Sequence, residues 1–138
     1  MSEGQIRPAK PTIVVHDGIA DAEDYARLLA EAGLGAVELE EAANAEPSTF
    51  YAANAVIILC GGLTEAVDRI LARLREDNQG QLIIVIVAVK DLELPRVNTR
   101  YFTGPTAFIM LQPPSPLFYR QISAIISKFQ ANLHLNGS

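Results

Sequence analysis

The chain has 138 residues, of which 49% are hydrophobic and 20% are charged, as is typical of one globular domain and not of a disordered protein. Its formal net charge is −5, and nine of its 16 acidic residues lie between Asp17 and Glu46, so it lacks the basic surface that direct DNA or RNA binding needs. No apolar run reaches the roughly 18 residues that span a bilayer, so membrane insertion is not expected and a cytoplasmic location is predicted.

Apolar runs alternate with helical patterns along the chain, which favours a parallel sheet covered by helices on both faces. The first strand is predicted at residues 12–15 and is followed by a polar turn. An amphipathic helix is predicted at 22–32, with Gly33 as its stop. A short second strand follows at 36–39. The segment 41–54 is weakly patterned, so any helix there is expected to be short or irregular.

The second half of the chain has stronger patterns. A buried third strand is predicted at residues 55–59, and Thr64 is a suitable N-cap for the helix that follows it. The fourth strand, at 82–89, is the most hydrophobic one in the sequence. After a stretch in which the pattern breaks, the fifth strand is predicted at 107–111. Ser115 then caps a last helix that has proline at its first position, which is a favoured arrangement.

Right-handed crossovers wind five such units into an α/β fold with a doubly wound parallel sheet in the order 2-1-3-4-5. We expect this domain to cover residues 12–131, with a flexible N-terminus at 1–11 and a tail or linker at 132–138. Ligands of such folds bind at the carboxyl ends of the strands. Five residues are predicted to gather there, with the last one close by: His16, Asp17, Cys60, Val87 and Gln112.

The segment 104–122, GPTAFIMLQPPSPLFYRQI, resembles the last strand and last helix of bacterial response-regulator receiver domains. The pattern of elements over residues 12–133 is also similar to that family. The resemblance implies a three-layer sandwich of the flavodoxin-like or receiver-like kind. It also implies a lysine before the proline that ends the last strand, and Gln112 stands in that place.

The resemblance further implies two acids after the first strand that help to hold Mg²⁺, a phosphate-accepting aspartate after the third strand, and a hydroxyl residue after the fourth. This chain has, in that order, His16 with Asp17, Cys60 or (after a slip of one residue) Leu59, and Val87 or Ala88. An acyl phosphate needs a carboxylate nucleophile, and Mg²⁺ prefers several oxygen ligands. The chain therefore resembles a degenerate receiver, a pseudo-receiver, and we expect no catalytic residue, no metal and no cofactor.

The expected function is that of a non-enzymatic interaction module in bacterial signal transduction, in a two-component or cyclic-nucleotide pathway. The resemblance suggests three kinds of partner: a histidine kinase, a diguanylate-cyclase domain or another receiver. Tyr101, Phe102 and Tyr119 are the candidate interaction residues, because the surface of the fourth and fifth helices commonly forms contacts and homodimers in receivers, and aromatic side chains suit such interfaces.

Two other interpretations stay open from the sequence. The pair Gly61 and Gly62 can let a ligand's phosphate approach the backbone, as in a domain that binds a nucleotide or another small molecule. Cys60, at a strand end before a helix N-terminus, is a candidate nucleophile of a thiol enzyme. A cysteine that simply packs in the core explains the same position.

Overall fold

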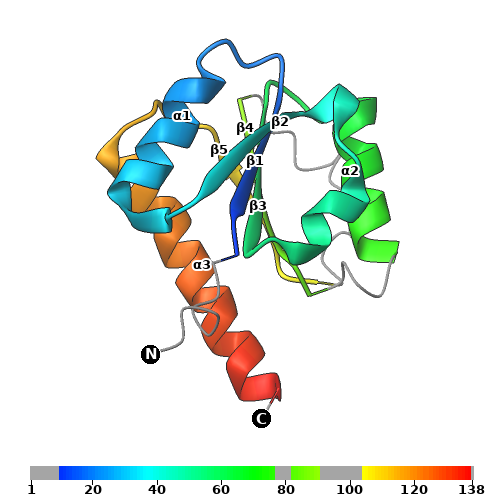
Figure 1. Ribbon diagram of the computed structural model, residues 1–138, viewed down its shortest axis with the longest axis vertical. Helices are drawn as coiled ribbons and strands as arrows, with labels where there is room; N and C mark the ends of the chain where they lie inside the picture. The colour runs from blue at the N-terminus through cyan, green and yellow to red at the C-terminus, as the bar shows by residue number, and fades with distance from the viewer. Residues whose placement is uncertain (1–9, 77–81, 91–103, 138) are drawn as a thin grey trace, which may run out of the picture.

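A five-stranded parallel sheet forms the centre of the computed structural model, which describes residues 10–76, 82–90 and 104–137 (Figure 1). The strands are β1 (Thr12–Asp17), β2 (Val37–Glu41), β3 (Ala55–Cys60), β4 (Ile84–Val89) and β5 (Thr106–Met110). Their order is β2-β1-β3-β4-β5, and all neighbours are parallel. This confirms the predicted doubly wound α/β sandwich.

Helices cover both faces of the sheet. They are α1 (Ala22–Leu29), α2 (Glu65–Glu76) and α3 (Pro116–Gly137), with the shorter turns η2 (Ala30–Leu34), η3 (Ala42–Asn44) and η4 (Pro47–Ala52). Figure 1 shows α1 and α3 on one face and α2 with the β2–β3 connection on the other. No helix within the described ranges is long and apolar enough to cross a membrane.

Two apolar cores lie against the sheet, one on each face. On one face the buried side chains of α2, among them Val67 and Ile70, pack against Val56 and Ile58 of β3. On the other face, buried residues of α1 and α3 pack together, and the rings of Tyr25 and Phe118 meet edge to face with centroids 5.1 Å apart. Every residue of β3 and β4 is buried, which explains why these two strands are continuous apolar runs in the sequence.

Several predicted boundaries differ from the structure. The first strand continues through His16 and Asp17 instead of ending before them. The first helix gives way after Leu29 to the π-helical turn η2, in which Gly33 has a φ of 134°. The predicted tail is helical, because α3 continues to Gly137. The irregular segment 41–54 is confirmed as the two short 3-10 turns η3 and η4.

A buried arginine holds the helix α2 to the amino ends of β4 and β5. Arg75 is only 5% exposed, and its guanidinium donates hydrogen bonds to Thr106 Oγ1 at 2.8 Å and to the carbonyl oxygens of Ile83 and Pro105 at 2.9 and 3.1 Å. Burial lowers the pKa of Arg75 to about 10. This contact was not predicted, because nothing in the sequence pattern links Arg75 to Thr106 or to the carbonyl oxygens of Ile83 and Pro105.

Candidate functional site

The register of the sheet brings Asp17 and Cys60 together at the carboxyl edge. Asp17 lies beside Cys60, Cys60 beside Val89, and Val89 beside Met110. Residues that pair in neighbouring parallel strands point to the same face of the sheet. Since Cys60 and Val89 belong to the core under α2, this row faces α2. The predicted proximity of Asp17 and Cys60 is confirmed.

His16 does not join this row. It pairs with Leu59, which belongs to the core under α1 and α3, whereas Asp17 is the next residue along the strand. Successive residues of a strand point to opposite faces, so His16 and Asp17, the last two residues of β1, are directed to opposite faces of the sheet, and their shared pocket stays a prediction. The Nδ1 atom of His16 is buried, and it has no hydrogen-bond partner within the described part of the chain.

Val87 also lies outside the predicted pocket. It pairs with Ile58 and Phe108, two residues before the end of β4, and is fully buried. Val89 is the residue of β4 that lies beside Cys60. The prediction of Val87 as a pocket residue is therefore wrong, because the sequence pattern does not reveal how far one strand extends beside another.

Gln112 lies after β5 and is exposed. Its backbone carbonyl accepts a hydrogen bond of 2.5 Å from the Tyr25 hydroxyl, which ties the end of β5 to α1. Its side chain lines a hollow of about 490 Å³ with Leu117, Arg120 and Gln121 at the start of α3. Gln112 thus belongs to the α3 side of this edge and not to the row that contains Asp17 and Cys60.

Cys60 occupies the end of β3, where the resemblance implies a phosphate acceptor. The residue is fully buried, and its Sγ lies 3.8 Å from the carbonyl oxygen of Ala88, to which it donates. Burial, followed by the charges of Asp17 and Asp68, raises the pKa of the Cys60 thiol to about 12. Because the thiolate is the nucleophilic form, this environment suits a core thiol and not a reactive one.

Asp17 is engaged with the start of α2. The Thr64 hydroxyl donates to Asp17 Oδ2 at 2.5 Å, and its oxygen accepts the backbone N–H of Val67 at 3.4 Å. Thr64 is thus confirmed as the N-cap of α2, and it also ties β1 to that helix. The contact was not predicted, although Asp17 ends β1 and Thr64 follows β3, and the two strands end side by side at this edge.

No group of three or more His, Cys, Asp or Glu side chains among the described residues is arranged to hold a metal ion. The two glycines after β3, Gly61 and Gly62, have space around them, since a Cβ at either would meet no heavy atom within 4 Å. The glycine pair is therefore not required by close packing, and it leaves the start of α2 accessible.

The three candidate interaction residues are placed differently. Tyr101 and Phe102 lie outside the described residues. Tyr119 is half-buried in the core of α1 and α3. Its hydroxyl lies against Gly33, where an added Cβ would be only 3.0 Å from Tyr119 Oη. Much of the Tyr119 side chain therefore serves contacts within the domain, and its predicted role in an interface stays a prediction.

Comparisons with known proteins identify the fold. No protein-family model matches the sequence, and the search of curated proteins gives no match. Among solved structures, a flavodoxin from Streptococcus pneumoniae TIGR4 is 13% identical with a TM-score of 0.54, covering 88% of this chain and 99% of that one. Oxidised Flavodoxin 2 from Bacillus cereus is 16% identical with a TM-score of 0.54, covering 90% and 99%. The chain therefore has the flavodoxin-like fold.

Proposed function

We propose that this protein is a pseudo-receiver: a non-enzymatic domain that regulates or localises protein partners in bacterial signal transduction. In this proposal it acts in the cytoplasm without being phosphorylated. Its partner is a histidine kinase, a diguanylate-cyclase domain or another receiver. The proposal rests on the resemblance of the sequence to receivers, and on the chemistry of the carboxyl edge of the sheet.

The observation that carries the proposal is the state of Cys60. A receiver-like acceptor has to present an ionised oxygen to a phosphoryl group. Here the corresponding side chain is fully buried and hydrogen-bonded to Ala88, and its thiol has a pKa of about 12. At neutral pH it stays protonated, which also disfavours a thiol enzyme that uses Cys60.

The neighbouring groups support the same conclusion. Phosphoryl transfer needs fixed positive charge near the transferred group. Gln112 is neutral, and its side chain lies in the hollow beside α3. The Asp17 carboxylate is hydrogen-bonded to Thr64, and His16 faces the other side of the sheet. Among the described residues, the positions that correspond to receiver chemistry therefore hold neither the second carboxylate nor the lysine that Mg²⁺-dependent transfer uses.

An exposed apolar surface favours protein contacts near β5 and α3. Met110 at the end of β5 is 49% exposed, and Leu117 in the first turn of α3 is 67% exposed. Large apolar side chains in such positions are suitable anchors for a partner. We assign them to the same interaction face as Tyr119, on the β5–α3 side of the domain.

A flavin-binding function is the second candidate, because flavodoxin-like folds hold FMN at the switch point between β1 and β3. The residues at this point do not fit a phosphate-bearing flavin. Residues 16–24 include no Ser, Thr, Lys or Arg. The first turn of α1 contributes Glu23 and Asp24, and that of α2 contributes Glu65 and Asp68. These acids oppose the anion that a helix N-terminus would otherwise attract.

Two measurements test the proposed function. Incubation of the protein with acetyl phosphate and Mg²⁺ should give no hydroxylamine-labile phosphoryl adduct by mass spectrometry.

In an affinity capture from bacterial lysate, Leu117→Asp should lose partners that the wild type retains. The matched control is Leu82→Asp, since Leu82 is 69% exposed but lies at the opposite end of the sheet. An adduct in the first experiment, or equal capture by both variants in the second, would contradict the proposal.

A further inference from the structure

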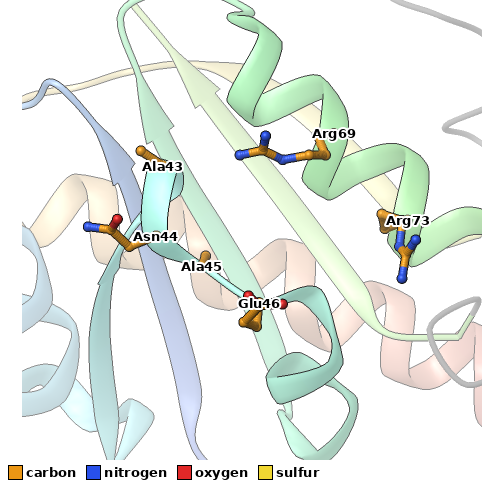
Figure 2. Close-up of a pocket in the computed structure, with 6 residues that line it drawn as sticks. All are labelled: Ala43, Asn44, Ala45, Glu46, Arg69 and Arg73. Carbon is orange, nitrogen blue, oxygen red and sulfur yellow. The ribbon is translucent and has the colours of Figure 1, made fainter.

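A groove lies between the helix α2 and the turn η3, which follows the carboxyl end of β2. Its volume is about 650 Å³, within the range of about 300–1,000 Å³ that is common for small-molecule sites. Its lining, shown in Figure 2, consists of Ala43, Asn44, Ala45, Glu46, Arg69 and Arg73. None of these six residues takes part in the proposed pseudo-receiver function, so the inference below goes beyond it.

Two arginines form one wall of the groove. Arg69 and Arg73 are four residues apart on α2, which places them on the same side of the helix one turn apart. Figure 2 shows the Arg69 side chain extending from α2 toward η3. Both residues are exposed, and neither has a hydrogen-bond or ion-pair partner among the residues that the structure describes. In a chain with a net charge of −5, these unpaired guanidinium groups are available to an anionic ligand.

The opposite wall combines small and polar side chains. Ala43 and Ala45 leave space between η3 and α2. The Asn44 amide donates to Glu41 Oε2 at 2.8 Å, which holds Asn44 in place. The Glu46 carbonyl accepts the backbone N–H and the hydroxyl of Thr49, at 2.9 and 2.7 Å, which holds the backbone that carries the Glu46 carboxylate. That carboxylate repels an anion beside it, but it accepts hydrogen bonds from hydroxyl or amino groups.

We propose that this groove binds a phosphate monoester, with the phosphate between Arg69 and Arg73 and hydroxyl or amino groups of the ligand toward Glu46. A phosphate monoester has three terminal oxygens and can accept paired hydrogen bonds from two guanidinium groups. A carboxylate has two oxygens, and a single guanidinium group that donates to both leaves no free oxygen for a second one. The six lining residues include no aromatic side chain that could stack on a base. A compact ligand such as a sugar phosphate or a phosphorylated side chain fits this chemistry better than a nucleotide.

The test is an NMR titration of the ¹⁵N-labelled protein with inorganic phosphate, glycerol 3-phosphate and glycerol at constant ionic strength. We expect both phosphates to shift the backbone amides of residues 43–46 and the signals of Arg69 and Arg73 in a saturable manner. Glycerol 3-phosphate should bind more tightly than inorganic phosphate, because only it has hydroxyl groups for Glu46. Glycerol alone should cause no saturable shift.

Variants identify the groups that bind. Replacing Arg69 and Arg73 together by Gln should weaken glycerol 3-phosphate binding by about 100-fold, since each charged hydrogen-bonding group contributes about tenfold or more. The matched control replaces Arg27 and Arg120 by Gln, which removes the same charge from exposed positions outside the groove and should change the affinity less than about threefold. Glu46→Gln should bind inorganic phosphate more tightly, because it removes the repelling carboxylate.

Two results would overturn the proposal: no saturable shift at the groove with either phosphate, or equal losses in the two double variants. A further titration separates the sources of the phosphate group. A phosphoserine peptide that binds at least tenfold more tightly than free O-phosphoserine identifies the side chain of a partner protein. Equal affinities identify a free phosphorylated metabolite. Either result supports a phosphate-monoester site.

Discussion

The two edges of the sheet differ in how their buried polar side chains are hydrogen-bonded. At the amino edge, Arg75 is buried and donates hydrogen bonds to Thr106, Ile83 and Pro105. At the carboxyl edge, the buried thiol of Cys60 has a long contact to Ala88, and the buried Nδ1 of His16 has no hydrogen-bond partner among the described residues. Functional groups of such folds gather at the carboxyl edge. The stronger buried hydrogen bonds are those of Arg75, which hold α2 to the sheet. The buried thiol at the carboxyl edge makes only a weak contact and has no group suited to phosphoryl chemistry.

The largest effect should come from Arg75→Met at the amino edge. It leaves the hydroxyl of Thr106 and the carbonyls of Ile83 and Pro105 without their charged donor, and we expect a loss of about 3 kcal/mol in the free energy of unfolding. Urea denaturation measures it. Arg73→Met is the control, since the exposed Arg73 should contribute within about 0.5 kcal/mol. A loss below about 1 kcal/mol for Arg75→Met would remove the contrast between the edges.

Cys60→Asp should cost about 2 kcal/mol at pH 7, because it places a carboxylate in a buried position close to Asp17 and Asp68. Both burial and these charges raise the pKa of the new carboxyl group above its value in the unfolded chain. The folded state then binds more protons, so the loss should shrink as the pH is lowered from 7 to 5. Urea midpoints at the two pH values test this. Cys60→Ala should show no such pH dependence. If Cys60→Asp loses the same free energy of unfolding at both pH values, the new carboxylate is not buried at this edge.

The native thiol itself predicts a pH dependence at alkaline pH. In the unfolded chain Cys60 ionises near its ordinary pKa of 9.0, whereas in the folded chain its pKa is about 12. Protonation therefore stabilises the fold, and this contribution is lost as the pH rises from about 9 toward 12. At pH 10 the loss should be about 1 kcal/mol relative to pH 8. Cys60→Ala should lose less than the wild type over this interval, and identical losses would show that the thiol is not shielded.

The smallest effect should come from Thr64→Val, which removes both the cap of α2 and the hydrogen bond to Asp17. We expect a loss of about 1 kcal/mol, as is usual for an N-cap. Thr64→Ser, which keeps the hydroxyl, should retain most of the stability in the same thermal or urea measurement. If Thr64→Val and Thr64→Ser have the same free energy of unfolding, the Asp17–Thr64 contact does not contribute to stability at this edge.

The sequence was informative where the structural signal is local. The apolar runs of β3 and β4 predicted buried strands, and the helical spacing of Val67, Ile70, Leu71 and Leu74 predicted the buried face of α2. The alternation of such elements was sufficient for the strand order. The Thr64 cap was also predicted correctly, because capping depends on residues within one turn.

The candidate site was predicted less well. The proximity of Asp17 and Cys60 follows from strand order, but the assignment of His16 and Val87 to the same pocket required the register and the faces of the strands. The groove at Arg69 and Arg73 was missed for a similar reason. Its other wall is η3, which lies more than twenty residues earlier in the chain and has no recognisable motif.

The sequence by itself determined the kind of elements, their order and the uncharged character of the acceptor position, since each depends on residue type and on short-range periodicity. Only the tertiary structure decided which side chains share a face, that Arg75 binds the ends of β4 and β5, and that α2 and η3 enclose a groove. These features depend on hydrogen bonds and packing between segments that are distant in the chain, and a period of two or 3.6 residues carries no information about them.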